Sequence, residues 1–348
     1  MPVMQTMGAR ASAGQGTGKA MAAASLPALL GPILGPVLGG LIINHLDWRW
    51  IFLVNIPICL LAIVLAWKGL PGEEQGNRSF RLDWIGFLLL SPSIVLIIYG
   101  FGEVSTHRDF GNIHVLGPVI AGLAALVTFV MYASKKGSET LLDVKLFRTG
   151  SFTVTSILLF LSGLTTFGAM LLLPLYFLQV RGESVLMSGL LLVPQGIGML
   201  LTRSLAGKWT DRIGSRPVVL MGTLITILGT IPFTQVGSET SYMYIVLALL
   251  LRGAGLGAVF MPVMATAYVG LSPKDIPHAS ITTRIMQQIG GAFGASIIAI
   301  ILQHQFNTLT SHDPAAVAIA FDHTFSWSII FTALALIPSA LLPKVKKK

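Results

Sequence analysis

The sequence predicts an all-α polytopic membrane protein, and three observations lead to this fold class. Hydrophobic residues make up 53% of the 348 positions and charged residues only 11%, whereas soluble domains carry about 25% charged residues. The apolar residues gather in spans near the length of about 20 residues that a helix needs to cross a bilayer. Short polar linkers containing Gly, Pro, Ser and Asp separate these spans.

We expect about ten transmembrane helices. The apolar stretches run roughly over residues 20–43, 51–70, 84–102, 113–133, 152–178, 185–206, 217–236, 242–271, 279–303 and 324–343. The single cysteine, Cys59, lies in one of them, which excludes a disulfide framework and a cysteine-based metal site. The histidines show no ligand spacing, so no metal site and no cofactor are predicted.

The basic residues predict the orientation of the helices. Most of the 23 Lys and Arg residues fall at the two chain ends and in every second linker, and the alternate linkers hold only Arg49, Arg108 and Arg181. By the positive-inside rule, both termini are then cytoplasmic. This distribution explains the net charge of +9 without a nucleic-acid partner. The lysines of the tail are expected to lie beside anionic lipid.

The first span contains two Gly-Pro pairs and ends on Gly-Gly. Glycines spaced four residues apart form a smooth stripe that allows two membrane helices to approach closely, and each proline removes a backbone donor, so the helix should bend. The residues of this bend are Gly31, Pro32, Gly35, Pro36, Gly39 and Gly40. The alternative interpretation is a helix that packs closely against its neighbours and has no further role. The run resembles motif C, the fifth-helix signature of drug:proton antiporters in the major facilitator superfamily.

Further strings resemble the fourteen-span antiporters of that superfamily, the EmrB/QacA type. These strings are Asp47–Pro57, Leu82–Gly86 and Leu141–Arg148. The resemblance implies a major facilitator-type helix bundle with three parts. Residues 1–70 would be a remnant of the N-terminal half, with the end of helix 4 and helices 5 and 6. Residues 71–150 would hold two extra central helices, and residues 151–348 the C-terminal six-helix half.

A second motif lies between the sixth and seventh spans. It resembles motif A, the cytoplasmic loop of the superfamily, and its matching residues are Gly207, Asp211, Arg212, Gly214 and Arg216. Gly214 suits a left-handed turn, and Asp211 can cap a helix or pair with an arginine. The resemblance implies a cytoplasmic gate that opens and closes as the halves rock. A basic loop that only sets topology is the alternative.

Several polar residues fall inside the predicted spans. Arg252 lies near the middle of its span, where an arginine is a functional candidate by default, although a structural arginine bonded to carbonyls is an equal alternative. The glycines after it, in Arg252–Gly257, predict close helix packing, because no strand precedes them as a nucleotide loop would require. We add Gln179, Gln195 and Gln287 as cavity candidates. Hydrogen bonds between helices are their alternative role.

Carboxylates are missing from the predicted spans. All 14 Asp and Glu residues fall in linkers or at span edges, whereas proton coupling normally needs an intramembrane carboxylate. The resemblance implies a reason, because Met1 to about Gly8 lines up with the end of the family's fourth helix. The first four helices and their acidic residues would then be lacking. We therefore do not expect the proton-carrying carboxylate on this chain; Asp83 and Glu103, at the margins of their spans, are the alternative candidates.

The resemblance implies a transporter and not an enzyme. The expected activity is proton-coupled efflux of amphipathic drugs or other small molecules by alternating access, in the bacterial inner membrane. No catalytic residues are predicted, because the spans do not contain a nucleophile with a neighbouring base. The expected partners are the lipid bilayer, a small amphipathic substrate and protons, with a periplasmic adaptor as a further candidate. The alternative is a truncated membrane fragment that does not transport.

Overall fold

The computed structural model describes residues 31, 35–69, 83–107, 111–136, 140, 142–237, 239–272, 275–309 and 313–343. These residues form helices, turns and short linkers, and none of them is in a strand. Nine helices in this part of the chain are long and apolar enough to cross a membrane, so the predicted all-α polytopic membrane fold is confirmed. They correspond to all predicted spans except the first, which the structure describes only in part.

The helices follow one another with short connections, as the polar linkers predict. Residues 35–45 are helical. The later elements are α3 (Trp50–Leu53), α4 (Asn55–Gly69), α5 (Trp84–His107), α6 (Ile113–Lys136), η2 (Val144–Arg148), α7 (Gly150–Gln179), α8 (Val185–Ile213), α9 (Ser215–Thr230), η3 (Ile231–Thr234), α10 (Tyr242–Ala267), α11 (Ile276–Thr308), α12 (Pro314–Leu334) and α13 (Leu336–Ala340).

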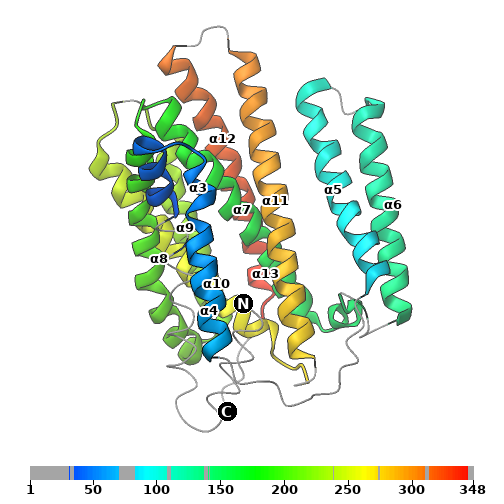
Figure 1. The fold of residues 1–348 in the computed structure, drawn as a ribbon. Coiled ribbons are helices and arrows are strands. Elements are labelled where there is room, and N and C mark those ends of the chain that lie inside the picture. The colour runs from blue at the N-terminus through cyan, green and yellow to red at the C-terminus, as the bar shows by residue number, and fades with distance from the viewer. Residues whose placement is uncertain are drawn as a thin grey trace.

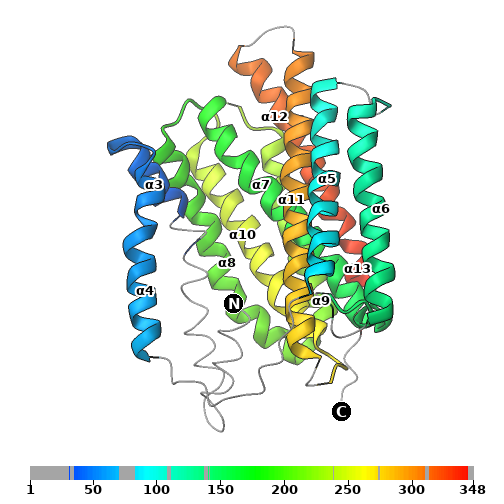
Figure 2. The same cartoon turned by 45° about the vertical axis from the view of Figure 1, so that its right-hand side comes forward.

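Helices α7 to α13 form one bundle. Figures 1 and 2 show α11 running along α7, and α10 lying against both α8 and α9. Helix α12 closes the bundle through contacts with α7, α9 and α11. The pair α5–α6 is attached to the outside of the bundle through α11.

Glycines allow the bundle helices to approach closely. At each of six seam glycines, an added Cβ would collide with a backbone carbonyl of the neighbouring helix. Along α8 and α10 the contacts are Gly198 with Leu250, Gly253 with Gln195 and Gly257 with Met199; along α7 and α11 they are Gly163 with Gln287, Gly290 with Phe160 and Gly294 with Leu164. Because lipid provides no hydrophobic drive between helices, such close packing is what holds them together. The packing role predicted for the glycines after Arg252 is confirmed.

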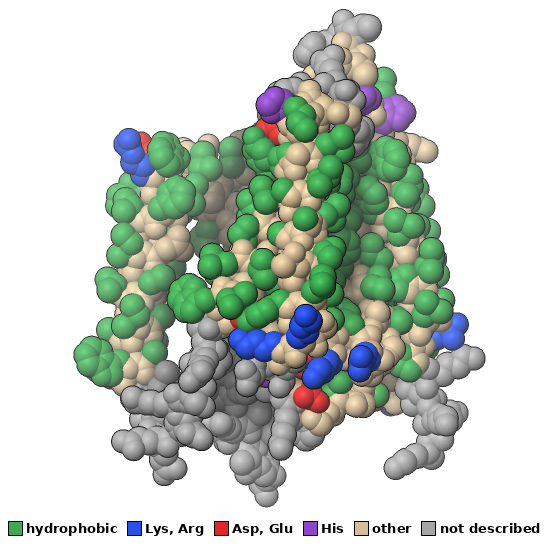
Figure 3. Space-filling model, turned by 90° about the vertical axis from the view of Figure 1, so that its right-hand side faces the viewer, with side chains coloured by type: hydrophobic (Ala, Val, Ile, Leu, Met, Phe, Trp, Pro, Cys, Tyr) green, Lys and Arg blue, Asp and Glu red, His purple; other side chains and the backbone are tan. Residues whose placement is uncertain are grey.

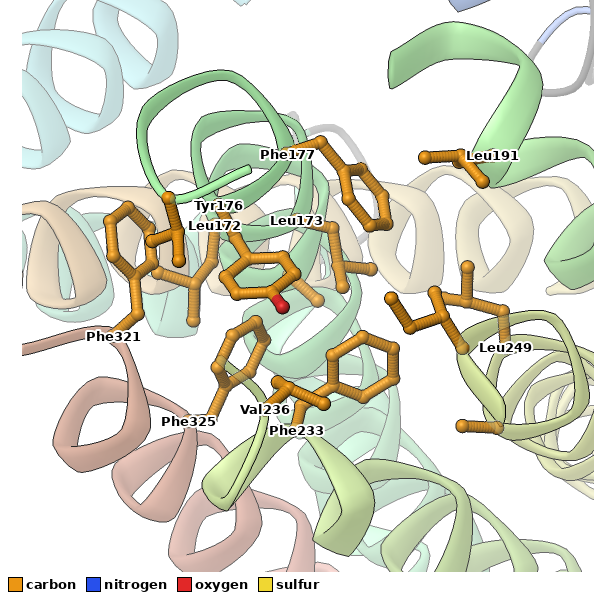
Figure 4. Packing of buried hydrophobic residues seen from close by; sticks show 14 of the residues in the cluster. Leu172, Leu173, Tyr176, Phe177, Leu191, Phe233, Val236, Leu249, Phe321 and Phe325 are labelled. Atoms are coloured by element: carbon orange, nitrogen blue, oxygen red, sulfur yellow. The ribbon is translucent and has the colours of Figure 1, made fainter. Parts of the chain in front are cut away.

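An aromatic core ties α7 to α12 at one end of the bundle (Figure 4). Tyr176 is fully buried, and its ring meets Phe177, Phe321 and Phe325 edge-on at centroid distances of 5.4, 5.9 and 6.0 Å. Edge-to-face geometry is favoured between aromatic rings. The Tyr176 hydroxyl donates to the Gly237 carbonyl at 3.2 Å, so its polar atom is also satisfied.

The α5–α6 pair is held by a polar cluster at one end. The buried Asp83 carboxylate accepts a hydrogen bond from the Tyr132 hydroxyl at 2.7 Å and another from the Gly86 amide at 3.0 Å. Lys136 approaches the same carboxylate oxygen at 3.9 Å. Asp83 therefore caps the start of α5 and binds the end of α6, which gives this margin carboxylate a structural role.

Helix α4 differs from all other spans. None of the residues in the most apolar part of Trp50–Lys68 is buried, and Figure 2 shows α4 standing apart from α5 to α13. Cys59 lies on this helix and is exposed.

Charge separates the two ends of the molecule. Figure 3 shows apolar side chains over the middle of one face, with Lys and Arg side chains gathered near one end. Basic residues of this end are Lys135 and Lys136 in the last turn of α6 and Lys145 and Arg148 in η2. We call it the basic end; the turn between α8 and α9 lies there too (Figure 1).

Candidate functional site

Arg252 lies near the middle of α10 and is 2% exposed. Its Nη1 donates to the Gln195 Oε1 of α8 at 2.6 Å, and its Nε donates to the Thr230 hydroxyl at the end of α9 at 3.3 Å. Within the described ranges no carboxylate forms an ion pair with this guanidinium. A buried cation is thus held by two neutral oxygens where three helices meet.

Close packing explains how Arg252 reaches both partners. An added Cβ on Gly229 of α9 would collide with the Arg252 backbone, and one on Gly253 would collide with the Gln195 carbonyl. The absence of side chains at these two positions brings α8, α9 and α10 within reach of one guanidinium. Because the Gln195 oxygen faces the cation, its amide nitrogen remains available as a donor.

The other amide candidates do not join this cluster. Gln179 is the last residue of α7 and is exposed. It therefore does not lie in a cavity inside the bundle. Gln287 on α11 is half-buried and accepts from Arg284 at 3.3 Å, while its backbone carbonyl packs on Gly163 of α7. The structure therefore brings together Arg252 and Gln195 from the predicted set and leaves Gln179 and Gln287 elsewhere.

The motif A match forms a helix end and not an extended loop. Helix α8 continues through Gly207, Asp211 and Arg212 to Ile213, and α9 begins at Ser215. Only Gly214 separates them, with φ 91° and ψ 163°, a conformation that glycine adopts readily and other residues do not. We predicted that the span ends near residue 206, and the helix is longer because the turn is so short.

The charged residues of this turn point away from the packed bundle. Asp211 and Arg212 are exposed and Arg216 is half-exposed. None of the three forms an ion pair with another residue in the part of the chain that the structure describes. A buried hydrogen bond ties the turn to α10: the Thr266 hydroxyl donates to the Ser215 hydroxyl at 2.7 Å.

The motif C segment contacts α8. A Cβ added at Gly40 would lie 2.7 Å from the Leu186 Cα, and one at Gly189 would lie 2.5 Å from the Pro36 carbonyl oxygen. Around Gly31, Gly35 and Gly39 nothing that the structure describes lies within 4 Å of an added Cβ. The described contact therefore runs through Gly40 and the Pro36 backbone, not through Gly31, Gly35 and Gly39. Pro32, and with it part of the predicted bend, lies outside the described residues.

Sequence reasoning missed Asp322. We placed the last span at 324–343 and this carboxylate in the preceding linker, but α12 begins at Pro314. Asp322 is therefore inside a candidate membrane span that covers Pro314–Ala340. The signal was present, because Asp313 caps the helix by accepting from the Ala316 amide at 2.8 Å and proline follows at the first helical position.

The described residues contain no group of three or more His, Cys, Asp or Glu side chains that could hold a metal ion. The polar side-chain groups inside the bundle include hydroxyls, the Gln195 amide, the Arg252 guanidinium and the Asp322 carboxyl group, whose Oδ1 atom is buried. This arrangement can bind and orient a molecule through hydrogen bonds.

Comparisons with known proteins agree with this architecture. The chain matches the family model of the Major Facilitator Superfamily over residues 1–295. It is 33% identical over 380 aligned positions to the multidrug resistance protein B homolog of Mycobacterium tuberculosis, which covers 99% of this chain and 70% of that protein.

Two further relatives are more distant. The chain is 29% identical over 314 positions to the puromycin resistance protein pur8 of Streptomyces alboniger, with 87% of this chain and 61% of that protein covered. It is 26% identical over 272 positions to the multidrug transporter protein MdtP of Bacillus subtilis, with 78% of this chain and 50% of that protein covered. The family match, the helix bundle and these relatives lead to one conclusion: the chain belongs to the major facilitator superfamily, whose members are transporters and not enzymes.

Proposed function

We propose that this chain exports amphipathic small molecules in exchange for protons, by alternating access. The relatives named for multidrug and puromycin resistance support the substrate class. The observation that carries the proposal is the Arg252–Gln195 contact of 2.6 Å in the middle of the bundle. A charged side chain inside a membrane bundle is expensive and marks a substrate or ion pathway.

Arg252 and Gln195 would act together in this mechanism. The guanidinium holds the Gln195 oxygen, so the amide nitrogen of Gln195 presents its hydrogens to a polar group of the substrate. Gln287 and Gln179 would be peripheral contacts on α11 and at the end of α7. The positive charge of Arg252 would favour a carboxylate or an electron-rich substrate in one state of the transport cycle.

The basic end would face the cytoplasm of the bacterial inner membrane, with both termini on that side. The α8–α9 turn at Gly214 would then serve as the inner gate. Its exposed charges, Asp211, Arg212 and Arg216, have room to pair with an opposing surface when the halves rock together. Gly207 would allow that surface to approach α8.

The Gly31–Gly40 segment would seal the contact between the halves. Residues 1–70 would belong to the N-terminal half, residues 71–150 would be the extra central part, and residues 151–348 the C-terminal half. The contact of Gly40 with Leu186 on α8 supports an interface between the first and third parts. A periplasmic adaptor would be a partner at the end opposite the basic end.

Transport by Arg252 variants tests the proposal. In energised vesicles that contain the whole protein, we expect Arg252→Ala to reduce dye export at least tenfold. Dye export by Arg252→Lys should lie between that of the wild type and that of Arg252→Ala. Lysine keeps the charge but loses the planar guanidinium that reaches two oxygens. Arg148→Ala is the matched control, since it removes an exposed arginine of η2 that lies outside the proposed site. Wild-type export by both Arg252 variants would rule out the functional role.

A second candidate function is a membrane fragment that does not transport. The unburied helix α4 favours it, because a transporter needs two packed halves to alternate access. Expression of this 348-residue chain alone separates the two candidates. Dye export and substrate-dependent proton movement by the chain alone would exclude the fragment, and their absence in well-folded protein would exclude the transporter.

A further inference from the structure

The carboxyl group of Asp322 on α12 is half-buried and takes no part in the site described above. Asp322 lies two turns into α12, between Phe321 and Phe325, which are 0% and 1% exposed and belong to the aromatic core (Figure 4). Its Oδ1 atom is buried and has no hydrogen-bond partner among the described residues. The Val236 backbone amide, between η3 and α10, faces the same carboxyl group.

No described cation neutralises this carboxylate. Tyr176 of α7 faces it, but the tyrosine hydroxyl donates to the Gly237 carbonyl. Arg181, after α7, donates to the Thr240 carbonyl at 2.7 Å, lies 3.7 Å from Glu183 and covers the Tyr242 ring at 4.4 Å. The ionisable neighbour on its own helix, His323, is exposed.

The loop between η3 and α10, which contains Val236, lies over the Asp322 carboxyl group. Water can reach this loop from the end of the molecule opposite the basic end. An opening of about 520 Å³ is lined by Gly237, Asp313, Pro314, Ala315, Ala318 and Ile319. Gly237 follows the Val236 amide that faces the carboxyl group, and Ala318 and Ile319 lie one turn before Asp322 on α12. The opening and the carboxyl group are thus separated by one residue of loop and one helical turn.

We propose that Asp322 is a proton-binding site of the C-terminal bundle, which exchanges protons with the outer side through this opening. A proton is the cation that fits, because the Oδ1 atom is buried and leaves no accessible surface for a larger ion. In the step, a hydronium ion transfers its proton to Oδ1 and leaves as water, and the carboxylate becomes a neutral acid. A neutral acid in an apolar site avoids the cost of burying an unpaired charge. The inference rests on the proposed proton exchange and names its carboxylate.

Infrared spectroscopy of the whole protein in lipid tests protonation without any transport. We expect the carbonyl band of a protonated carboxyl group to appear as the pH is lowered and to be lost in Asp322→Asn. Asp313→Asn is the matched control, because asparagine also caps helices and the exposed Asp313 lies at the same opening. Its difference spectrum should keep the band. An unchanged band in Asp322→Asn would overturn the proposal.

A second variant covers the case in which Asp322→Asn does not fold. Asp322→Glu keeps an ionisable group, and its band should shift in frequency and in the pH of its appearance. A band identical to that of the wild type would again overturn the assignment. In vesicles, Asp322→Asn should release at least tenfold fewer protons per substrate added than Asp313→Asn. If the wild type transports without proton movement, the antiport proposal fails, whereas the infrared result still decides whether Asp322 binds a proton.

Discussion

Helices α10 and α4 are both apolar enough to cross a membrane, yet they occupy opposite environments. Half of the most apolar window of α10 is buried, and none of the corresponding window of α4 is. The difference lies in small residues. Helix α10 places Gly253, Gly255 and Gly257 against neighbouring backbones, whereas the only glycine of α4 is its last residue, Gly69. Hydropathy therefore predicts which segments cross the membrane, and the glycines explain why α10 packs more closely than α4, although α12 packs without any glycine.

The strongest test of this comparison places a large side chain in the α8–α10 seam. Gly253→Leu should abolish folding of the bundle, because its side chain would occupy the space of the Gln195 carbonyl. Overpacking usually costs about 1–3 kcal/mol and more where the neighbour cannot move, as with this backbone carbonyl. Size-exclusion chromatography in detergent after heating measures the loss. Gly117→Leu on α6 is the control, because nothing described lies within 4 Å of an added Cβ there. Equal losses of folded protein in both variants would contradict the close packing of α8 against α10.

The second test concerns the turn at the basic end, where conformation and not space requires glycine. Gly214→Ala forces a side chain into φ 91° and should destabilise the protein by about 1–3 kcal/mol. Gly207→Ala, seven residues earlier in α8, has open space around it and should be neutral or stabilising, since alanine favours helices. Thermal unfolding of the pair measures the difference. A Gly214→Ala midpoint equal to that of the wild type would show that the turn relaxes.

The third test separates the α5–α6 pair from the main bundle. Tyr132→Phe removes the hydroxyl that donates to the buried Asp83 carboxylate at 2.7 Å. A hydrogen bond to a charged group contributes about 1.5–3 kcal/mol. We expect earlier proteolysis between α5 and α6 in this variant and unchanged protection of α7 to α12. Tyr99→Phe, on an exposed position of α5, is the matched control, and loss of protection in α7 to α12 would contradict an independent α5–α6 unit.

These comparisons also show what the sequence could predict. The spans, the family and the packing role of the Arg252–Gly257 glycines followed from apolar length and small-residue spacing. The partner of Arg252 did not, because Gln195 lies 57 positions earlier and reaches it only through the bare surfaces of Gly229 and Gly253. Asp322 was missed because hydropathy placed the start of the last span too late, although Asp313 and Pro314 form a clear helix start.

The smallest expected effect is on α4. Leu61→Ala on this helix should change the stability by less than about 0.5 kcal/mol, because Leu61 is 60% exposed. Leu172→Ala, at a fully buried position of α7, should cost about 2–5 kcal/mol. Thermal unfolding in lipid nanodiscs compares the two. Equal losses would mean that α4 is packed against a surface in the bilayer, and repetition at two protein-to-lipid ratios would show whether a second copy provides that surface.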